Sequence, residues 1–353
     1  MLKNVVMAYH DRPPIMSYLQ KAFERKRVSA RQFDMNTNHW FDKWVIHTVD
    51  KQLWNLRLLP KGRSAFEGHP LKHLQYRSTL AGKLVDEFKP ELFLLIRGWR
   101  LNEETMQYIS KKCTLIGWWL NSDSKKMDEV FSEIHHYDYY FFFNSSGIEE
   151  ARKRGYENCE LLQHAVDPES FYPIKNLSQK YDCCFVGGWS EKRQAVMEKT
   201  VEITGEVAIY GSKWKKRNLS NPKILKALKG DYIGGKELVE LYNSSRIVLN
   251  ITTWGTDAKS RSWINMRVFE VPACGAFLLT DGSRDLENVV TPGKHVVVYE
   301  DIEDFEGKLK YYIKHEDARR HIAEQGYDHV IKNHSYDNMV DKIIDAYNKV
   351  KKA

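Results

Sequence analysis

Short apolar runs alternate with longer amphipathic segments along most of this chain, and glycine-rich or polar turns separate them. Continuous apolar runs suit strands buried on both faces of a parallel sheet, and the segments between them suit the helical crossovers that such a sheet requires. The pattern therefore predicts an α/β protein. The predicted strands are residues 4–9, 92–97, 114–120, 139–143, a short one from 161, 181–186, 207–210, 247–251, 276–280 and 296–299.

Two such sets of strands and helices follow one another, and a chain of 353 residues is too long for one ordinary core. We therefore expect two domains. The first is a Rossmann-like domain over residues 1–170, with an irregular insertion at about 36–77. A linker over 171–180 leads to a second α/β domain over 181–330, and residues 331–353 form the final helix.

The insertion at 36–77 interleaves aromatic side chains with cations, among them Trp40, Lys43 and Trp44. Residues 1–100 contain 18 Lys and Arg against 9 Asp and Glu, a net charge of +9; the whole chain carries +7 (54 against 47), which leaves −2 for the rest. This asymmetry favours a polyanionic partner for the first domain. A Trp-rich helical insertion with a solvated basic surface is the alternative interpretation.

The cysteines and the apolar runs bear on metal binding, disulfide formation and membrane insertion. The five cysteines are odd in number and show no Cys-x-x-Cys spacing, which disfavours a zinc site or a disulfide framework. No apolar run approaches the ~20 residues that span a bilayer, and the first residues lack the apolar region of a signal peptide. We therefore expect a cytoplasmic protein without a membrane segment.

The segment 265–281 predicts one helix–glycine–strand unit of the second sheet. Asn265, Arg267 and Glu270 lie at the start of its helix, and Gly275 suits the left-handed position that ends a helix. An Arg and an acid at a helix N-terminus in a parallel sheet suit a phosphate and the paired hydroxyls of a ribose. A buried salt bridge that orients the helix is the alternative.

A strand, two glycines and a cation in the first turn of a helix form a second pattern, which favours phosphate binding. Gly187 and Gly188 follow the strand at 181–186, Ser190 is placed to cap the next helix, and Arg193 lies in its first turn. The helix N-terminus and the cation attract the charge of a phosphate, and glycines let it approach the backbone.

Polar loops also follow two strands of the first domain. His10 and Asp11 follow the first strand, and Asp123 follows the strand at 114–120. Ligands of open α/β sheets bind beyond the carboxyl ends of the strands, so these side chains are placed for chemistry. A helix cap and a turn are the structural alternative.

These motifs resemble a known family. The matching segments are FVGGWSEKR (185–193), IYGSKW (209–214), ELVELYNSSRIVLNI (237–251), NMRVFEVPACGAFLLTD (265–281) and IAEQGYDHVIKNHSY (322–336), with weaker matches at 118–123, 137–156 and 161–173. On these segments the last two thirds of the chain resembles the GT-B glycosyltransferases. Within that fold it is similar to the spore-maturation-type glycosyltransferases, with their glycosyl transferase family 1-like C-terminal domain.

The resemblance implies two Rossmann-like domains that face each other across a cleft, with the last helix crossing back toward the N-terminal domain. It implies a hexosyl- or pentosyltransferase (EC 2.4) whose C-terminal domain binds a nucleotide-sugar, which we expect to be a UDP-sugar. It implies neither a permanently bound cofactor nor a tightly bound metal, because Arg, Lys and helix dipoles stabilise the leaving nucleoside diphosphate.

The resemblance also implies particular site residues. They are the ribose-binding acid Glu270, the diphosphate-loop residues Gly187, Gly188 and Arg193, the second phosphate cation Arg267 with Asn265 beside it, and Tyr210 and Trp214 near the base pocket. Ser262 departs from the family, because many retaining members carry Glu eight residues before the ribose acid. An inverting reaction would instead need a base at the acceptor hydroxyl, and its candidates are Asp123, Asp11 and His10.

The acceptor has to be argued from charge. Our leading hypothesis is a hydroxymethylated pyrimidine in DNA, as in viral DNA modification, bound by the basic first domain in the host cytoplasm. A protein or a cell-surface glycan is the alternative acceptor. A third hypothesis is a catalytically silent binding protein that has kept the GT-B fold, and the intact set of Gly187, Gly188, Arg267 and Glu270 favours an enzyme over it.

Overall fold

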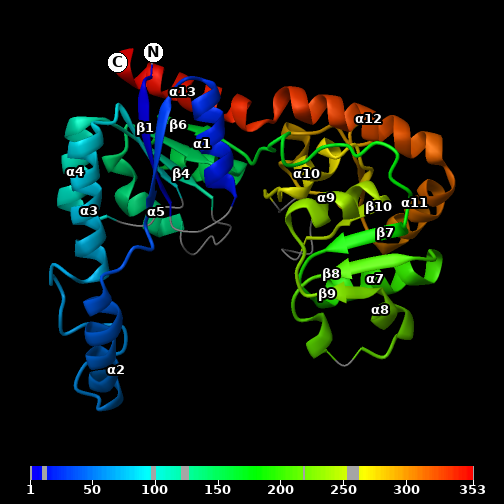
Figure 1. The fold of residues 1–353 in the computed structure, drawn as a ribbon, viewed down its shortest axis with the longest axis horizontal. Helices are drawn as coiled ribbons and strands as arrows, with labels where there is room; N and C mark the ends of the chain where they lie inside the picture. The colour runs from blue at the N-terminus through cyan, green and yellow to red at the C-terminus, as the bar shows by residue number, and fades with distance from the viewer. Residues whose placement is uncertain are drawn as a thin grey trace. The chain divides into compact units, whose positions relative to one another are not determined.

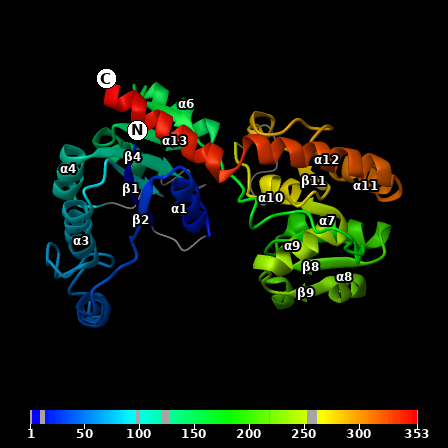
Figure 2. The ribbon, with the colours of Figure 1, turned by 45° about the horizontal axis from the view of Figure 1, so that its top comes forward.

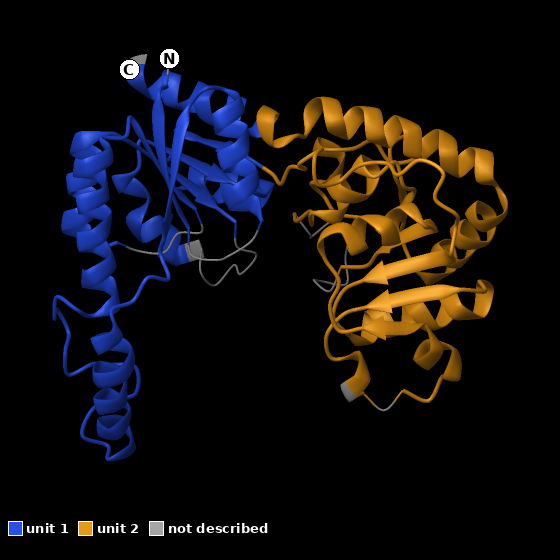
Figure 3. Ribbon diagram, viewed as in Figure 1, with its two compact units in different colours: residues 1–162, 339–353 blue, residues 163–338 orange. Residues whose placement is uncertain are grey.

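The computed structural model describes residues 2–9, 14–96, 101–120, 127–217, 219–252 and 262–352. Two compact units make up the chain: unit 1 comprises residues 1–162 together with 339–353, and unit 2 comprises residues 163–338 (Figure 3). Each unit is built around one six-stranded sheet. The α/β prediction is confirmed.

The sheet of unit 1 has the order β2-β1-β3-β4-β5-β6, and all neighbouring strands run parallel (Figure 1). Every residue of its central strand β3 is buried, which explains the unbroken apolar run. The strands are β1 (Asn4–Tyr9), β2 (Ser29–Asp34), β3 (Leu92–Ile96), β4 (Thr114–Trp119), β5 (Tyr139–Phe142) and β6 (Cys159–Leu161). The helices are α1 (Ile15–Arg25), η1 (Asp42–Ile46), α2 (His47–Asn55), α3 (His73–Phe88), α4 (Glu103–Lys112), α5 (Met127–Glu133), η3 (Ile134–His136), α6 (Ser145–Lys153) and most of α13 (Tyr336–Lys352).

The sequence pattern did not predict β2. Its residues are mostly polar, and only Phe33 is buried, because the strand lies at the edge of the sheet and pairs with β1 alone. At this edge the two faces of the strand are only partly covered, so its sequence lacks the apolar run that identifies the inner strands.

The insertion at 36–77 is more regular than its composition suggests. Residues 40–55 are continuously helical through η1 and α2, and α3 begins at His73, inside the stretch that was predicted to be irregular. We call residues 40–72 the arm. Both ribbon views place α2 beyond the start of α3, so the arm extends away from the sheet of unit 1 (Figures 1 and 2).

The sheet of unit 2 has the order β12-β11-β10-β7-β8-β9 and is also parallel throughout. Two buried clusters, one on each face of the sheet, form its core. The strands are β7 (Tyr181–Val186), β8 (Val207–Tyr210), β9 (Leu228–Gly230), β10 (Ser245–Asn250), β11 (Leu278–Asp281) and β12 (Val297–Tyr299). The helices are α7 (Glu191–Ile203), η4 (Trp214–Lys216), α8 (Pro222–Ala227), α9 (Gly235–Asn243), α10 (Arg267–Ala273), η6 (Leu286–Asn288), α11 (Ile302–Lys314) and α12 (Glu316–Asn333).

Two local predictions are confirmed at the ends of helices in unit 2. The Ser190 hydroxyl accepts a hydrogen bond from the Arg193 backbone N–H and so caps α7. Gly275 adopts a φ of +63° directly after α10, where a side chain would be strained. The cap and the glycine fix where α7 begins and where α10 ends.

None of the described helices is both long enough and apolar enough to cross a membrane. All five cysteines have free thiols, and four of them are buried.

Candidate functional site

The polar residues of unit 2 gather where the strand order reverses. After β7 the chain adds β8 and β9 on one side and then β10, β11 and β12 on the other. The carboxyl ends of the neighbours β7 and β10 therefore form the topological switch point, where open α/β sheets bind ligands. The helices α7 and α10 both begin at this edge.

Backbone hydrogen bonds join the loop after β7 to the end of β8 and the loop that follows it. The Gly187 backbone N–H donates to the Tyr210 carbonyl (2.8 Å), and the Trp189 N–H donates to the Ser212 carbonyl (2.9 Å). Gly211 lies so close that a Cβ on it would stand 2.0 Å from the Gly187 carbonyl oxygen. Glycine at 211 is therefore required for the two loops to meet.

Arg193 reaches from the first turn of α7 into the switch point. Its Nη1 donates to the Gly188 carbonyl (2.7 Å) and its Nε to the Ile251 carbonyl (2.8 Å). Burial, together with the nearby Arg267, lowers the pKa of Arg193 to about 10. Arg193 thus stays charged at neutral pH while it faces a second cation.

Arg267 is fixed by an amide network. Its Nε donates to the Val186 carbonyl (2.9 Å) and its Nη1 to the Asn250 Oδ1 (3.0 Å). Asn265 donates from Nδ2 to the same Asn250 oxygen (2.7 Å), and its own Oδ1 accepts from the Arg267 backbone N–H (3.1 Å). The predicted Asn265 and Arg267 therefore act as one unit.

Glu270 lies one turn into α10 beside Arg267. In the described part of the chain no donor forms a hydrogen bond to its carboxylate, and part of its surface remains exposed. Burial of the carboxyl group raises the pKa of Glu270 to about 7, although Arg267 acts in the opposite direction. The side chain is therefore a poorly solvated acceptor with room for an external partner.

Asp281, at the end of β11, is a site residue that the sequence did not reveal. Its Oδ2 pairs with Lys192 Nζ (2.6 Å) and accepts from the hydroxyl of Thr252 (2.6 Å) and its backbone N–H (3.0 Å). Lys192, in the first turn of α7, is thereby held at the switch point next to Arg193. Two features of the sequence could have indicated this pair: Asp281 directly follows a predicted strand, and Lys192 directly precedes the predicted Arg193.

The structure places the two predicted base-pocket residues differently from each other. Trp214 is only 1% exposed, and its Nε1 donates to the Gly187 carbonyl (2.9 Å), so its ring supports the loop from inside the core. Tyr210 is half-buried at the end of β8, and its ring lies against Gly230. Of these two residues, only Tyr210 keeps surface for a ligand.

The candidate bases His10, Asp11 and Asp123 lie outside the described residues, and so does much of the loop after Thr252. Ser262, where the family often has Glu, is buried. Within the ranges described above, no group of three or more His, Cys, Asp and Glu side chains could hold a metal ion.

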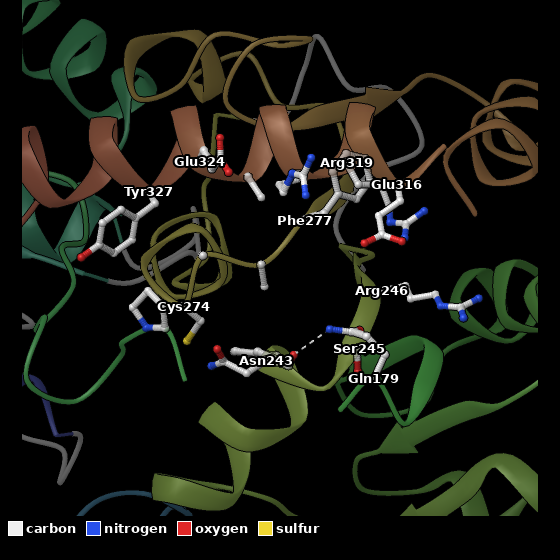
Figure 4. Close-up of a pocket in the computed structure, with 16 residues that line it drawn as sticks. Gln179, Asn243, Ser245, Arg246, Cys274, Phe277, Glu316, Arg319, Glu324 and Tyr327 are labelled. Carbon is white, nitrogen blue, oxygen red and sulfur yellow. Dashed lines mark hydrogen bonds between the residues drawn. The ribbon is translucent and has the colours of Figure 1, made fainter. Parts of the chain in front are cut away.

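A pocket of about 460 Å³ in unit 2 lies elsewhere. Figure 4 shows Arg319 on α12 facing it, with Ser245 and Arg246 from the start of β10. Ser245 and Arg246 lie at the amino end of β10, whereas Asp281 ends β11 and Arg267 begins α10 at the opposite, carboxyl edge of the sheet. The candidate site is therefore assigned from its converging side chains and not from this cavity.

Comparisons with known proteins agree with this geometry. Residues 192–345 match a family described as glycosyl transferase-like. The chain is 22% identical over 271 residues to the spore protein CgeB of Bacillus subtilis, which covers 73% of this chain and 83% of that protein. Its fold is similar to that of a glycosyltransferase from Rickettsia africae (TM-score 0.68, 12% identity, 99% of both chains). It is also similar to that of Anabaena HepE in complex with UDP (TM-score 0.66, 9% identity, 98% of this chain and 100% of that chain). The predicted resemblance is confirmed: the chain has the two-sheet α/β fold of the GT-B glycosyltransferases, and its residues 192–345 match the glycosyl transferase-like family.

Proposed function

We propose that this enzyme transfers a sugar from a UDP-sugar to an acceptor hydroxyl, with the donor bound at the switch point of unit 2. The observation that carries the proposal is the pair Arg193 and Arg267, two half-buried cations close enough that Arg267 helps to lower the pKa of Arg193. Their mutual repulsion is relieved when a diphosphate lies between them.

The diphosphate has further partners at this point. Glu191 and Lys192 begin α7, and their backbone N–H groups are the unpaired donors of a helix N-terminus. The Lys192 ammonium stands on the same turn. During transfer the bond from the sugar to the β-phosphate oxygen breaks, and these groups stabilise the charge that develops on the leaving diphosphate.

Glu270 is proposed to bind the ribose. Its carboxylate can accept from two adjacent hydroxyls, and no described group of the protein competes for it. Tyr210 is proposed to border the base pocket, and Trp214 to hold the Gly187 loop in position. Solved complexes of Anabaena HepE with UDP and with UDP-glucose support a uridine nucleotide as the donor.

The acceptor remains a choice between two hypotheses. The DNA hypothesis rests on the charge of residues 1–100, and neither the described side chains nor the comparisons add to it. We therefore favour a protein or glycan hydroxyl, the alternative that the relationship to a spore protein suggests. A duplex-binding series across salt concentrations separates the two.

The catalytic base follows from the stereochemical course. For an inverting reaction we propose Asp123, with Asp11 and His10 as alternatives. Asp123→Asn should then lower the turnover rate by roughly two to four orders of magnitude while UDP binding is unchanged. A variant with near-full activity would exclude Asp123 as the base.

The experiment that tests the proposed function is hydrolysis of UDP-sugars without acceptor, followed by chromatography of the released UDP. Glycosyltransferases use water slowly as a surrogate acceptor, so UDP should accumulate with one sugar donor above the others. A silent binding protein would bind UDP in calorimetry yet release none from any UDP-sugar.

A further inference from the structure

The arm of unit 1 exposes an unusual share of the large apolar side chains. Among the described residues, eight such side chains are exposed, and four of them belong to this short segment. They are Trp40 (63% exposed), Trp44 (66%), Leu56 (68%) and Leu58 (71%). Single exposed apolar residues are ordinary, but a group on one projecting element indicates an interaction surface.

This exposure is not a failure of the arm to pack. The Asp50 carboxylate is buried and accepts from the Ala65 backbone N–H (2.9 Å). Trp54 Nε1 donates to the Arg63 carbonyl (2.7 Å), and the ring of Phe41 stacks on His69 with centroids 5.6 Å apart. The arm thus has its own small core. Trp40 touches it through the edge of the Phe41 ring, and all four exposed side chains still leave most of their surface in water.

Cations surround the exposed side chains. Residues 40–72 contain six Lys and Arg against three acids, and one of those acids is the buried Asp50. Lys43 lies over the ring of Trp44, with the ammonium 5.5 Å from the centroid. Arg57 stands directly between the two leucines, with a φ of +59° in the turn that ends α2. The surface is therefore apolar and positively charged at once.

The chemistry of this surface distinguishes its possible occupants. A nucleic acid would use the cations and indoles, but its charged phosphate backbone offers Leu56 and Leu58 no apolar partner. A second copy would bring two positively charged arms together. A bilayer takes aliphatic side chains into the acyl boundary, indoles at the headgroups and cations at anionic lipids.

We propose that the arm docks the protein on an anionic lipid surface, with Leu56 and Leu58 entering the interface and the neighbouring cations binding headgroups. Trp40 and Trp44 lie four residues apart on the same helical face and reach the headgroup level. Docking of this kind is peripheral and reversible, and it does not depend on the donor site.

Vesicle flotation with the full chain tests the proposal. The protein should float with phosphatidylcholine vesicles that contain phosphatidylglycerol and stay behind with phosphatidylcholine alone, and raised salt should weaken binding. The double variant Leu56→Asn and Leu58→Asn should lower the partition coefficient by roughly tenfold or more. Arg57→Asn, which tolerates the positive φ, should lower it about fivefold.

The control is Leu225→Asn, an exposed leucine of α8 in unit 2, which should leave vesicle binding unchanged. Thermal unfolding and UDP binding should match the wild type in every variant. Loss of vesicle binding with normal UDP binding then reports on the arm, and loss of UDP binding reports on the proposed donor site. The proposal is overturned if the wild type ignores anionic vesicles or if the leucine variant binds them normally. The proposal is also overturned if the wild type binds duplex DNA instead of vesicles and the leucine variant binds DNA equally well. It is likewise overturned if the wild type forms a dimer that the leucine variant does not form.

Discussion

The indole Nε1 of Trp214 donates a 2.9 Å hydrogen bond to the carbonyl oxygen of Gly187. The ring lies in the core under the sheet of unit 2, against Phe185, while the carbonyl belongs to the loop that precedes α7. A side chain that the family resemblance assigned to the base pocket therefore fixes the glycine loop of the proposed diphosphate site from behind.

Replacing Trp214 with Phe should disturb that loop without emptying the core. The variant keeps an aromatic ring but leaves the Gly187 carbonyl without its donor, which costs about 1–3 kcal/mol of unfolding free energy. UDP affinity should fall several-fold, because the glycine loop loses its fixed position. Urea unfolding and calorimetry measure the two effects. Trp44→Phe, on the exposed arm, is the matched control, and equal UDP affinity in both variants would contradict the positioning role.

Gly211→Ala should be among the most damaging glycine substitutions in unit 2. The added Cβ would stand 2.0 Å from the Gly187 carbonyl oxygen, at a φ of +154° that side chains rarely adopt. The two loops must separate, with an expected loss of roughly 1–3 kcal/mol and weaker UDP binding. Gly82→Ala, with open space inside α3, should be neutral or slightly stabilising. Similar melting temperatures for both variants would refute the close approach.

Uridine binding should become tighter as the pH rises through about 7. The pKa of Glu270 is raised to about 7 by burial, so the carboxylate that we propose accepts from the ribose predominates only above that pH. Uridine itself carries no titrating phosphate, so calorimetry between about pH 6 and 8 isolates this group. A Glu270→Gln variant should give a flat profile, and an unchanged slope in that variant would assign the pH dependence to another group.

The same shift has a defined sign for stability. A carboxyl whose folded pKa lies above its unfolded value stabilises the fold fully below about pH 4.5, and this contribution is lost as the pH approaches 7. The difference in unfolding free energy between the wild type and Glu270→Gln should therefore change with pH in that window, by about 1–3 kcal/mol.

The DNA hypothesis makes its own prediction. If the acceptor is DNA, duplex affinity must fall steeply with salt, because each neutralised phosphate releases condensed counterions. Replacing Lys43, Arg57 and Arg63 together should reduce the salt slope by up to about three units and leave UDP binding unchanged. A flat line at low salt would leave the protein or glycan acceptor as the surviving hypothesis.

Much of the fold is readable in the sequence because most strands are covered on both faces. β1 and β7 match their apolar runs to the residue, and the Ser190 cap and Gly275 were evident from residue type. β2 was not predicted, because this edge strand buries only Phe33 and therefore has no apolar run. The first turn of α3 fell inside the stretch predicted to be irregular because the buried residues of this helix begin only at Arg77.

The candidate site was only partly readable. Arg267 and Glu270 stood out because a charged pair at a helix start in an apolar segment is unusual. Asp281 and Asn250 did not, because their importance lies in contacts with residues far along the chain, such as Lys192. Such long-range partners leave no periodic signal in the sequence.

The central claim is that the ribose and diphosphate of a UDP-sugar bind at Glu270, Arg193 and Arg267. Calorimetric titration of UDP into wild type and Glu270→Ala tests it most directly. Loss of a charge-assisted hydrogen bond costs about 1.5–3 kcal/mol, so the variant should bind UDP roughly ten- to hundredfold more weakly while its circular dichroism stays that of the wild type. Unchanged UDP affinity in a folded Glu270→Ala protein would contradict the account.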